Sequence, residues 1–392
     1  MSDGAALSAL MSSRPIRVLH VMEATIGGTK RHLLDLVESI DKDAIQIEIA
    51  SPRVRSDPHG DTSFFSDMTA LGVVVHEIPM VRSIRPIADL RTTLALARLI
   101  RRRRHQVVHT HSTKAGLVGR LAAFACSGTR TVHTPHGFYF LNFSRLVVRS
   151  VLRWQERVLG WITSRVIVLS KGERTVAAGV ISLRKLRYIP NTFDSFDPVS
   201  RAEARDRLGL PEDAGVVVTT ARFTAQKAPF DVAETFALVH RLHPETRFVW
   251  MNEGELKDAV EARLRTLGVE AATIRPGYLS DARELLTAAD VYVHLARWEG
   301  APYSVMEAMT AGVPVVAARA VGTEDLIEDG VTGILVDQGD VSAAASAVAR
   351  LLTDLGEART LSRNARKAIV VHHNRDAMAR ATEQVYRELV PG

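Results

Sequence analysis

The segment from residue 291 to residue 317 restricts the fold more than any other part of the sequence. It reads VYVHLARWEGAPYSVMEAMTAGVPVVA. The pattern predicts a short buried strand over Val291–His294, a helix over Tyr303–Ala311 that Gly312 ends, and a second strand over Val313–Ala317. This succession is typical of an open parallel sheet. In such a sheet, ligands bind in the crevice at the carboxyl ends of the strands.

Two carboxylates stand on either side of the predicted start of this helix. Glu299 falls on the loop after the first strand, and Glu307 falls about one turn inside the helix. Pro302 suits the first helical turn, because its missing N–H would have no partner there. The free N–H groups near Ser304 and Val305 favour an anion. A single glutamate on a helix is usually only solvated, but two at this spacing in an apolar segment favour a binding site.

The segment from Arg297 to Asp340 resembles the E-x7-E region of retaining glycosyltransferases of family 4. It matches nearly all of the patterns S-x-x-E-G-x-P-x-x-x-x-E-A-M-A-x-G-x-P-V-V-A and G-x-x-E-x-I-x-D-G-x-x-G-x-L-V. The resemblance implies an α/β protein of the GT-B class, with two Rossmann-like domains facing across a cleft. It also implies that Glu307 holds the ribose hydroxyls of a nucleotide diphosphate sugar, and that Glu299 and the N–H groups after Gly300 orient the sugar hydroxyls.

Length and charge agree with two domains that have different partners. The 392 residues suffice for two domains of ordinary size, and 46% apolar with 24% charged residues is typical of a soluble globular protein. Residues 1–194 carry a net charge of +13, from 28 Lys and Arg against 15 Asp and Glu, and the remainder carries −7. We expect no nucleic-acid partner, because zinc spacing, RNA-binding motifs and aromatic platforms among the arginines are all missing.

The first strand, Ile16–Met22, leads into a glycine turn. Gly27 and Gly28 precede a predicted helix over Lys30–Ser39, as at the entry of a Rossmann-like half. The turn is not G-x-G-x-x-G, so a nicotinamide cofactor is poorly supported. In family 4 the corresponding G-G-x-x-R-H loop faces the active cleft, and this chain matches it through Arg31 and His32.

Three histidines follow the next strands. His109 and His111 lie at spacing two around the predicted strand Val107–Thr110, where they would face the same side. A metal site is one interpretation, but the sequence offers no third ligand nearby, so we favour a polar strand end that lines the cleft. His136 opens HGFYF, and such a histidine is either structural or placed against a bound sugar. The resemblance implies the second role, and the H-G-F-x-F form is similar to the branch that builds capsular and exopolysaccharides.

A basic amphipathic helix is predicted within residues 143–165. Its arginines repeat every four residues and so form one stripe, and Trp154 belongs to a broad apolar surface. Either the helix lies in an anionic membrane interface, or its apolar side is core and the arginines are solvated. We favour the membrane interpretation, because the adjoining HGFYFLNF is also apolar. The residues assigned to a membrane or acceptor surface are Arg145, Arg149, Arg153, Trp154 and Arg157.

The second half begins again with a strand, Gly215–Thr220, and a basic loop. Arg222 and Lys227 are five residues apart between strand and helix, which suits a clamp for two phosphates, although such pairs are usually only surface residues. Family 4 has G-R-x-x-x-x-K-G here, and its Arg and Lys hold the donor diphosphate; Ala221 and Ala228 replace the glycines in this chain. The catalytic residues we expect are His136, Glu299, Arg222 and Lys227. The expected donor site comprises Gly27, Gly28, Arg222, Lys227, Glu299, Gly300, Tyr303, Ser304, Val305 and Glu307.

We predict three segments along the chain. Residues 1–193 form an acceptor-binding domain, residues 194–372 bind the nucleotide sugar, and residues 373–392 form a helix that crosses back to the first domain. The boundary falls in PNTFD, which resembles the family's P-N-G-V-D hinge. No metal or other cofactor is expected, since the D-x-D at Asp41–Asp43 falls in a surface turn.

The expected activity is retaining transfer of a hexosyl or N-acetylhexosaminyl group to a saccharide acceptor in exopolysaccharide or capsule assembly, and we expect this acceptor to be linked to polyprenyl diphosphate. A non-hydrolysing sugar-nucleotide 2-epimerase and a silent nucleotide-sugar-binding protein are the alternatives. The single cysteine, Cys126, excludes an internal disulfide. No signal peptide and no run of about 18 apolar residues is found, so we expect a cytoplasmic protein on the inner face of the membrane.

Overall fold

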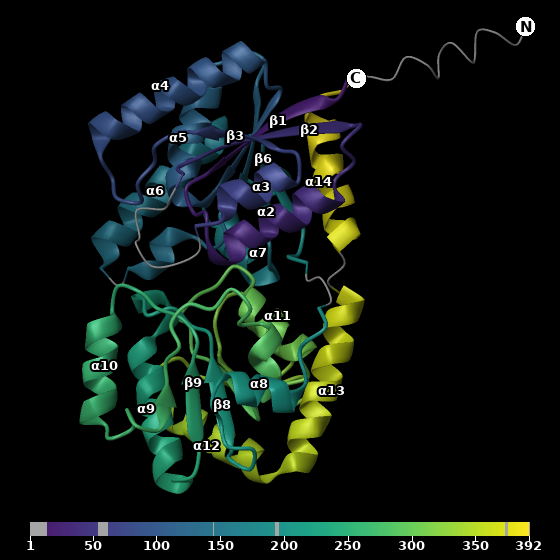
Figure 1. Cartoon of the computed structure of the whole chain (residues 1–392). Helices are drawn as coiled ribbons and strands as arrows, with labels where there is room; N and C mark the ends of the chain where they lie inside the picture. Colours follow the sequence, from purple (N-terminus) through teal and green to yellow (C-terminus); the bar gives the residue numbers. More distant parts are fainter. Residues whose placement is uncertain (1–13, 54–61, 144, 193–195, 373–374, 392) are drawn as a thin grey trace, which may run out of the picture.

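The computed structural model describes residues 14–53, 62–143, 145–192, 196–372 and 375–391. Two parallel sheets form separate α/β domains, which Figure 1 shows one above the other. The first sheet has the order β3-β2-β1-β4-β5-β6-β7, and the second has the order β10-β9-β8-β11-β12-β13. Within these residues, every helix is too short or too polar to cross a membrane.

The first domain is built on seven strands with helices between them. Its strands are β1 (Ile16–Met22), β2 (Ile45–Ser51), β3 (Val74–Glu77), β4 (Val107–His111), β5 (Arg130–Thr134), β6 (Arg165–Val168) and β7 (Leu186–Tyr188). Its helices are α2 (Gly27–Ser39), α3 (Phe64–Ala70), α4 (Pro86–Arg103), α5 (Ser112–Phe124), α6 (Leu146–Ile162) and α7 (Lys171–Ala178). The strand order reverses between β1 and β4, so the loops after these strands diverge and leave a crevice.

The second domain repeats this plan with six strands. Its strands are β8 (Val216–Thr219), β9 (Arg247–Trp250), β10 (Thr273–Ile274), β11 (Val291–His294), β12 (Val315–Ala318) and β13 (Ile334–Val336). Its helices are α8 (Arg201–Arg207), α9 (Pro229–Leu242), α10 (Lys257–Thr266), α11 (Tyr303–Thr310), α12 (Val341–Thr353) and α13 (Leu355–His372). The order reverses between β8 and β11, so this sheet also has a crevice at the carboxyl ends of its strands.

Several core strands are continuously apolar, as expected when helices cover both faces of a parallel sheet. Val216, Val217 and Val218 of β8 are all fully buried. The last helix, α14 (Arg375–Leu389), packs against the first domain, although the second domain precedes it in the chain. Its Tyr386 is fully buried in the same apolar cluster as Val18 and Leu36.

The predicted elements agree with the structure apart from their ends. Helix α4 starts at Pro86, which takes its first position, and it ends before Arg104, where φ is +54°. Gly27 and Gly28 belong to the first turn of α2 rather than to a preceding turn. Pro302 is the residue before α11, with extended backbone, and not part of its first turn.

The domain limits 1–193, 194–372 and 373–392 stay predictions. Phe193 and Asp194 of the predicted hinge lie outside the described residues.

Candidate active site

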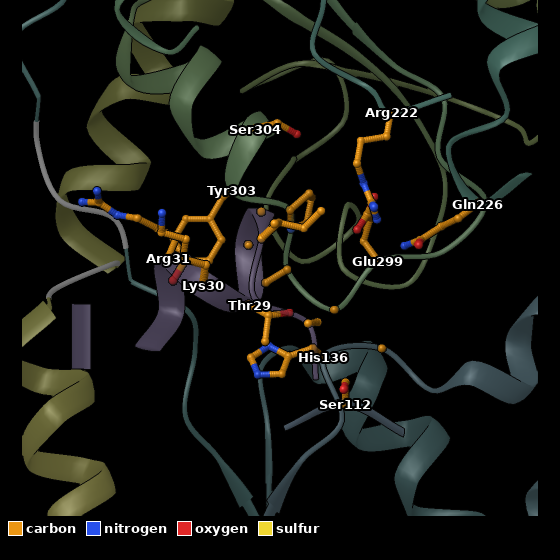
Figure 2. Close-up of a pocket in the computed structure, with 18 of the residues that line it drawn as sticks. Thr29, Lys30, Arg31, Ser112, His136, Arg222, Gln226, Glu299, Tyr303 and Ser304 are labelled. Atoms are coloured by element: carbon orange, nitrogen blue, oxygen red, sulfur yellow. The ribbon is translucent and has the colours of Figure 1, made fainter. Parts of the chain in front are cut away.

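A cavity of about 570 Å³ lies between the carboxyl edges of the two sheets. The loops after β1, β4 and β5 line it from the first domain, and the loops after β8, β9 and β11 line it from the second. Figure 2 shows Arg222, Gln226 and Glu299 on one side and Lys30, Arg31 and Tyr303 on the other, with His136 and Ser112 below. Its volume suits a ligand the size of a nucleotide sugar.

Glu299 and Lys227 form a buried ion pair on the wall of this cavity. Oε1 of Glu299 contacts Nζ of Lys227 and lies 3.2 Å from Nε2 of His294, which is fully buried below it. Burial alone would raise the pKa of Glu299, but Lys227 and His294 outweigh it and lower the pKa to about 2. Glu299 is therefore a carboxylate across the physiological pH range. The loop after β8 and the loop after β11 thus present one cation and one anion side by side.

Glu307 and the start of α11 line a second part of the wall. Glu307 is half-buried, and burial raises its pKa despite the nearby charges of Arg283 and Arg31. The N–H of Val305 bonds to the carbonyl of Pro302 at 3.2 Å, so it is not free for an anion as the sequence predicted. Ser304 is half-buried and lines the cavity.

Glycines allow the two domains to approach each other closely around the cavity. A Cβ on Gly300 would lie 3.2 Å from the backbone N of Gly137 and 3.2 Å from the carbonyl carbon of His136. A Cβ on Gly28 would lie 3.2 Å from the ring of Tyr303, and one on Gly322 would lie 2.7 Å from the carbonyl oxygen of Gly300. Side chains at Gly28 and Gly300 would push the domains apart, and one at Gly322 would displace the Gly300 loop within the second domain, which explains why the motifs carry glycine there.

The backbone at His136 is strained, and a buried carboxylate holds it. His136 has a φ of +54°, which costs free energy for a residue with a Cβ, and Gly137 follows with +91°. Oε1 of Glu173 accepts a hydrogen bond from the N–H of Gly137 at 2.7 Å, and Oε2 accepts one from Leu169 at 2.7 Å. Burial raises the pKa of Glu173 to about 7, although both hydrogen bonds oppose the shift. Glu173 therefore fixes the loop that presents His136 to the cavity.

Polar contacts cross from one domain to the other beside the cavity. The hydroxyl of Tyr303 donates to Oδ2 of Asp35 at 3.3 Å, and Arg31 binds the other carboxylate oxygen at 2.9 Å. Nδ2 of Asn191 donates to the carbonyl of Ala301 at 3.1 Å. These contacts join the G-G-x-x-R-H loop and the hinge to the start of α11.

The expectation that His109 and His111 have no third ligand nearby is wrong. Nε2 of His111 lies 2.9 Å from Nδ1 of His20, and Nδ1 of His111 lies 3.0 Å from Nε2 of His136. The pairing of β1 with β4 sets His20 beside His109, and α2 adds His32, whose Nδ1 is 2.9 Å from the Asn191 side-chain oxygen. We call these five residues the histidine cluster: His20, His32, His109, His111 and His136.

Helix α6 exposes its apolar side rather than burying it. Trp154 and Trp161 are 65% and 75% exposed, whereas Glu156 on the opposite side is buried and paired with Arg120 at 3.0 Å. The interpretation in which this apolar surface is core is therefore wrong for most of it. The exposed side, which we call the α6 face, comprises Leu146, Val147, Val151, Trp154 and Trp161.

The arginines of the predicted stripe differ in their exposure. Arg145 precedes α6 instead of belonging to it. Arg145 and Arg157 are exposed, whereas Arg149 and Arg153 are half-buried. The guanidinium of Arg153 lies 5.7 Å from the ring centre of Phe140, so packing holds it partly against the protein.

Sequence reasoning missed several residues of the site. Three of them hold the walls of the cavity by hydrogen bonds between segments that are far apart in the chain: Glu173, Asp35 and Asn191. Glu173 did carry a local signal, because Ser170 and Glu173 form the first half of a capping box; the side chain of Ser170 accepts from the N–H of Glu173 at 3.0 Å. Tyr386 had no such signal.

Solved structures of the same fold define the class of protein. HepE of Anabaena, in complex with UDP and glucose, superposes with a TM-score of 0.78 at 19% identity, over 94% of this chain and 99% of that one. Sucrose-phosphate synthase of Thermosynechococcus elongatus superposes with a TM-score of 0.81 at 20% identity, over 95% and 98%. With two parallel-sheet domains around one cavity, the chain has the GT-B fold.

Sequence comparisons identify the family. Residues 26–195 match "Glycosyltransferase Family 4", and residues 200–368 match "Glycosyl transferases group 1". The chain belongs to glycosyltransferase family 4 and is a glycosyltransferase. It is 29% identical to the UDP-Gal:alpha-D-GlcNAc-diphosphoundecaprenol alpha-1,3-galactosyltransferase of Escherichia coli, over 74% of this chain and 77% of the relative. It is 22% identical to the capsular polysaccharide biosynthesis glycosyltransferase CapM of Staphylococcus aureus, over 76% and 80%.

Proposed function

We propose that this chain is a retaining glycosyltransferase that moves a sugar from a nucleoside diphosphate sugar to a lipid-linked saccharide in exopolysaccharide or capsule assembly. The buried Lys227–Glu299 pair on the cavity wall is the observation that carries the proposal, because it offers one cation for a diphosphate and one carboxylate for sugar hydroxyls. The name of the Escherichia coli relative includes a diphosphoundecaprenol acceptor, which supports an acceptor of that chemistry here.

In this proposal the second domain holds the donor. Lys227 and Arg222 neutralise the leaving diphosphate, and Glu299 with the N–H groups after Gly300 orients the sugar. The bond from the anomeric carbon to the diphosphate breaks as the acceptor oxygen attacks from the same face, and a diphosphate oxygen takes the acceptor's proton. This route needs no carboxylate nucleophile.

Glu307 binds the ribose in the same proposal. We expect Glu307→Gln to weaken binding of UDP about tenfold, since a charged acceptor of two hydroxyl groups contributes roughly 1.5 kcal/mol more than a neutral one. Isothermal titration calorimetry measures the effect. Glu324→Gln, an exposed change in the same domain, is the matched control and leaves affinity unchanged. Equal affinities for wild type and Glu307→Gln would contradict the ribose assignment.

A turnover screen tests the function itself. UDP- and GDP-sugars are supplied with and without membrane lipid extract, and product is followed by mass spectrometry. Lipid-dependent transfer with retained anomeric configuration supports the proposal. Epimerised donor without acceptor would indicate the sugar-nucleotide 2-epimerase, and binding without chemistry would indicate a silent binding protein.

The α6 face supports an acceptor that arrives from a membrane. Leu152 and Gln155 of α6 line the cavity, and the exposed Trp154 lies between them in the sequence. Further exposed apolar residues lie on two other helices of the first domain, Ile87 and Leu90 on α4 and Phe124 on α5. Apolar side chains bordered by arginines suit an anionic membrane surface. We therefore place the enzyme at the inner face of the cytoplasmic membrane.

Removing the two tryptophans should release the protein from membranes. We expect Trp154→Ser with Trp161→Ser to weaken binding to anionic liposomes about a hundredfold, because burying one large apolar side chain contributes roughly 1.5–3 kcal/mol. Co-sedimentation with phosphatidylglycerol vesicles is the measurement. Leu242→Ser with Leu355→Ser, two exposed apolar residues of the second domain, is the control. Undiminished binding of the tryptophan variant would refute the α6 face as the contact.

A further inference from the structure

The histidine cluster is part of a longer hydrogen-bonded chain that passes through the last helix. Beyond His111 and His20, the hydroxyl oxygen of Tyr386 lies 3.2 Å from Nε2 of His20 and 2.7 Å from Nδ1 of His109. Nε2 of His109 lies 2.8 Å from Oγ1 of Thr134. The order along the chain is His136, His111, His20, Tyr386, His109 and Thr134. Of these six residues, His136 lines the cavity and the other five are buried.

The direction of one hydrogen bond in this chain fixes the direction of all the others. A neutral imidazole has a hydrogen on one nitrogen and a lone pair on the other, so each ring passes the direction on. The buried hydroxyl of Tyr386 has a single hydrogen and two ring partners, so it donates to one ring and accepts from the other, since an unused buried hydrogen is unfavourable. The rings are neutral because burial lowers the pKa of His20 to about 3 and holds those of His109, His111 and His136 well below the usual range. Two arrangements remain, and they differ in which nitrogen of His136 carries the hydrogen.

Thr134 decides between the two arrangements. Among the described residues, the side-chain oxygen of Thr134 contacts only Nε2 of His109. If His109 donated to it, the buried threonine hydroxyl would keep a hydrogen without an acceptor, which is unfavourable. If Thr134 donates instead, Nε2 of His136 accepts from His111 at the far end. The hydrogen of His136 then lies on Nδ1.

We propose that His136 acts in the cavity as a neutral N–H donor through Nδ1, and that Thr134 and Tyr386 are positioning residues that keep it in this form. The inference rests on the proposed function. The hydrogen bond from Nδ1 of His136 goes to a hydroxyl oxygen of the bound sugar. His136 then presents no lone pair to the cavity, so it does not remove the acceptor's proton. A histidine side chain in water favours the Nε2–H form, so the chain holds His136 in the less common one.

Two threonines on neighbouring strands give a matched test. Thr134→Val removes the hydroxyl that begins the chain. Thr110→Val removes a hydroxyl that lies 2.9 Å from Nδ1 of His133, outside the chain. Both threonines are fully buried. Tyr386→Phe provides a second break in the chain and removes only the hydroxyl.

Nitrogen NMR of protein labelled with ¹⁵N-histidine reads the proton position directly. In the wild type we expect the Nδ1 signal of His136 in the protonated range and its Nε2 signal in the lone-pair range. Thr134→Val and Tyr386→Phe shift His136 towards the Nε2–H form and lower kcat at least tenfold, up to the roughly 10²–10³ lost when a transition-state donor is removed altogether. Their KM for the donor changes less. Thr110→Val leaves the His136 spectrum and kcat unchanged.

Three results would overturn the inference. They are an Nε2–H or doubly protonated His136 in the wild type, a Thr134→Val protein that behaves like Thr110→Val, and stoichiometric zinc or nickel in the purified protein. A metal would matter because one nitrogen from each of His20, His109 and His111 lies within 4.8 Å of the other two. Failure of the proposed function is distinguishable, because it appears as a lack of sugar transfer by a wild type whose His136 spectrum is still as expected.

Discussion

Replacing Glu299 by glutamine should lower kcat for sugar transfer by about 10²–10³, which corresponds to roughly 3–4 kcal/mol of transition-state stabilisation. The amide has nearly the shape of the carboxylate but no charge, so it neither orients the sugar hydroxyls as strongly nor balances Lys227. Steady-state kinetics with the donor found in the turnover screen are the measurement. Binding of the nucleoside diphosphate alone should persist, because Arg222 and Glu307 are unchanged.

The control for this prediction is a glutamate with an equally close cationic partner outside the cavity. Glu234 binds Arg263 at 2.6 Å on the surface of the second domain, and both side chains are more than a third exposed. Glu234→Gln should keep wild-type kcat, since surface ion pairs contribute little. A Glu299→Gln enzyme with more than a tenth of wild-type kcat would show that the carboxylate is not needed for chemistry.

Mild acid should unfold the protein between about pH 6.5 and pH 4.5. The histidine cluster is neutral in the fold, since burial lowers the pKa of His20 to about 3 and of His32 to about 4, with those of the other three well below 6.5. In the unfolded chain these histidines take up protons near pH 6.5. Their contribution to the free energy of unfolding is therefore fully present above that pH and is lost as the pH falls. Five such groups change the free energy of unfolding by up to about 7 kcal/mol per pH unit.

Carboxyl groups offset part of this loss. Burial raises the pKa of Asp35 to about 6 and that of Glu173 to about 7, so each stabilises the fold as the pH falls towards 4.5. The histidines outnumber them, and a net loss of several kcal/mol between pH 7 and pH 5.5 is the expected result. Urea unfolding followed by tryptophan fluorescence at a series of pH values measures it. His109→Gln should reduce the slope by about 1.4 kcal/mol per pH unit.

Thr110→Val provides the control for acid sensitivity. It changes a buried residue of β4 next to His109 and His111 but removes no titratable group, so it should leave the slope unchanged. A free energy of unfolding that stayed constant from pH 7 to pH 5 would contradict the neutrality of the cluster. It would then also remove the basis for a directional chain of hydrogen bonds.

The order of strands and helices was predictable because each strand carries its own signal. Segments such as Val291–His294 are short and apolar, and glycine or proline marks the ends of the helices between them. The start of α2 was misplaced, since Gly27 and Gly28 in the sequence resemble a turn although they belong to the helix. Alternating strands and helices alone do not distinguish the GT-B class from other α/β folds. The class was predicted from the resemblance of the segment around Glu299 and Glu307 to family 4.

The residues of the site were predictable where each belongs to a short local motif. His136, Arg222, Lys227, Glu299 and Glu307 all line the cavity, as the motifs implied. Their catalytic and binding roles stay predictions. The histidine cluster and the hydrogen-bonded chain that continues from it could not be predicted. The cluster depends on the pairing of β1 with β4, and the chain depends on a tyrosine more than 270 residues from His109. The amphipathic pattern of α6 does not by itself say which side faces the protein, and an exposed apolar side was favoured only because the adjoining HGFYFLNF is also apolar.

The position of α14 has a consequence for the synthesis of the protein. The first domain is not complete until Tyr386 and its helix have left the ribosome, although its last strand, β7, ends at Tyr188. At ordinary elongation rates the intervening residues take roughly 10–40 s to translate. During that time the nascent first domain exposes the apolar groove that α14 later fills. The fifteen residues of α14 therefore determine when, and not only whether, the first domain can complete its fold.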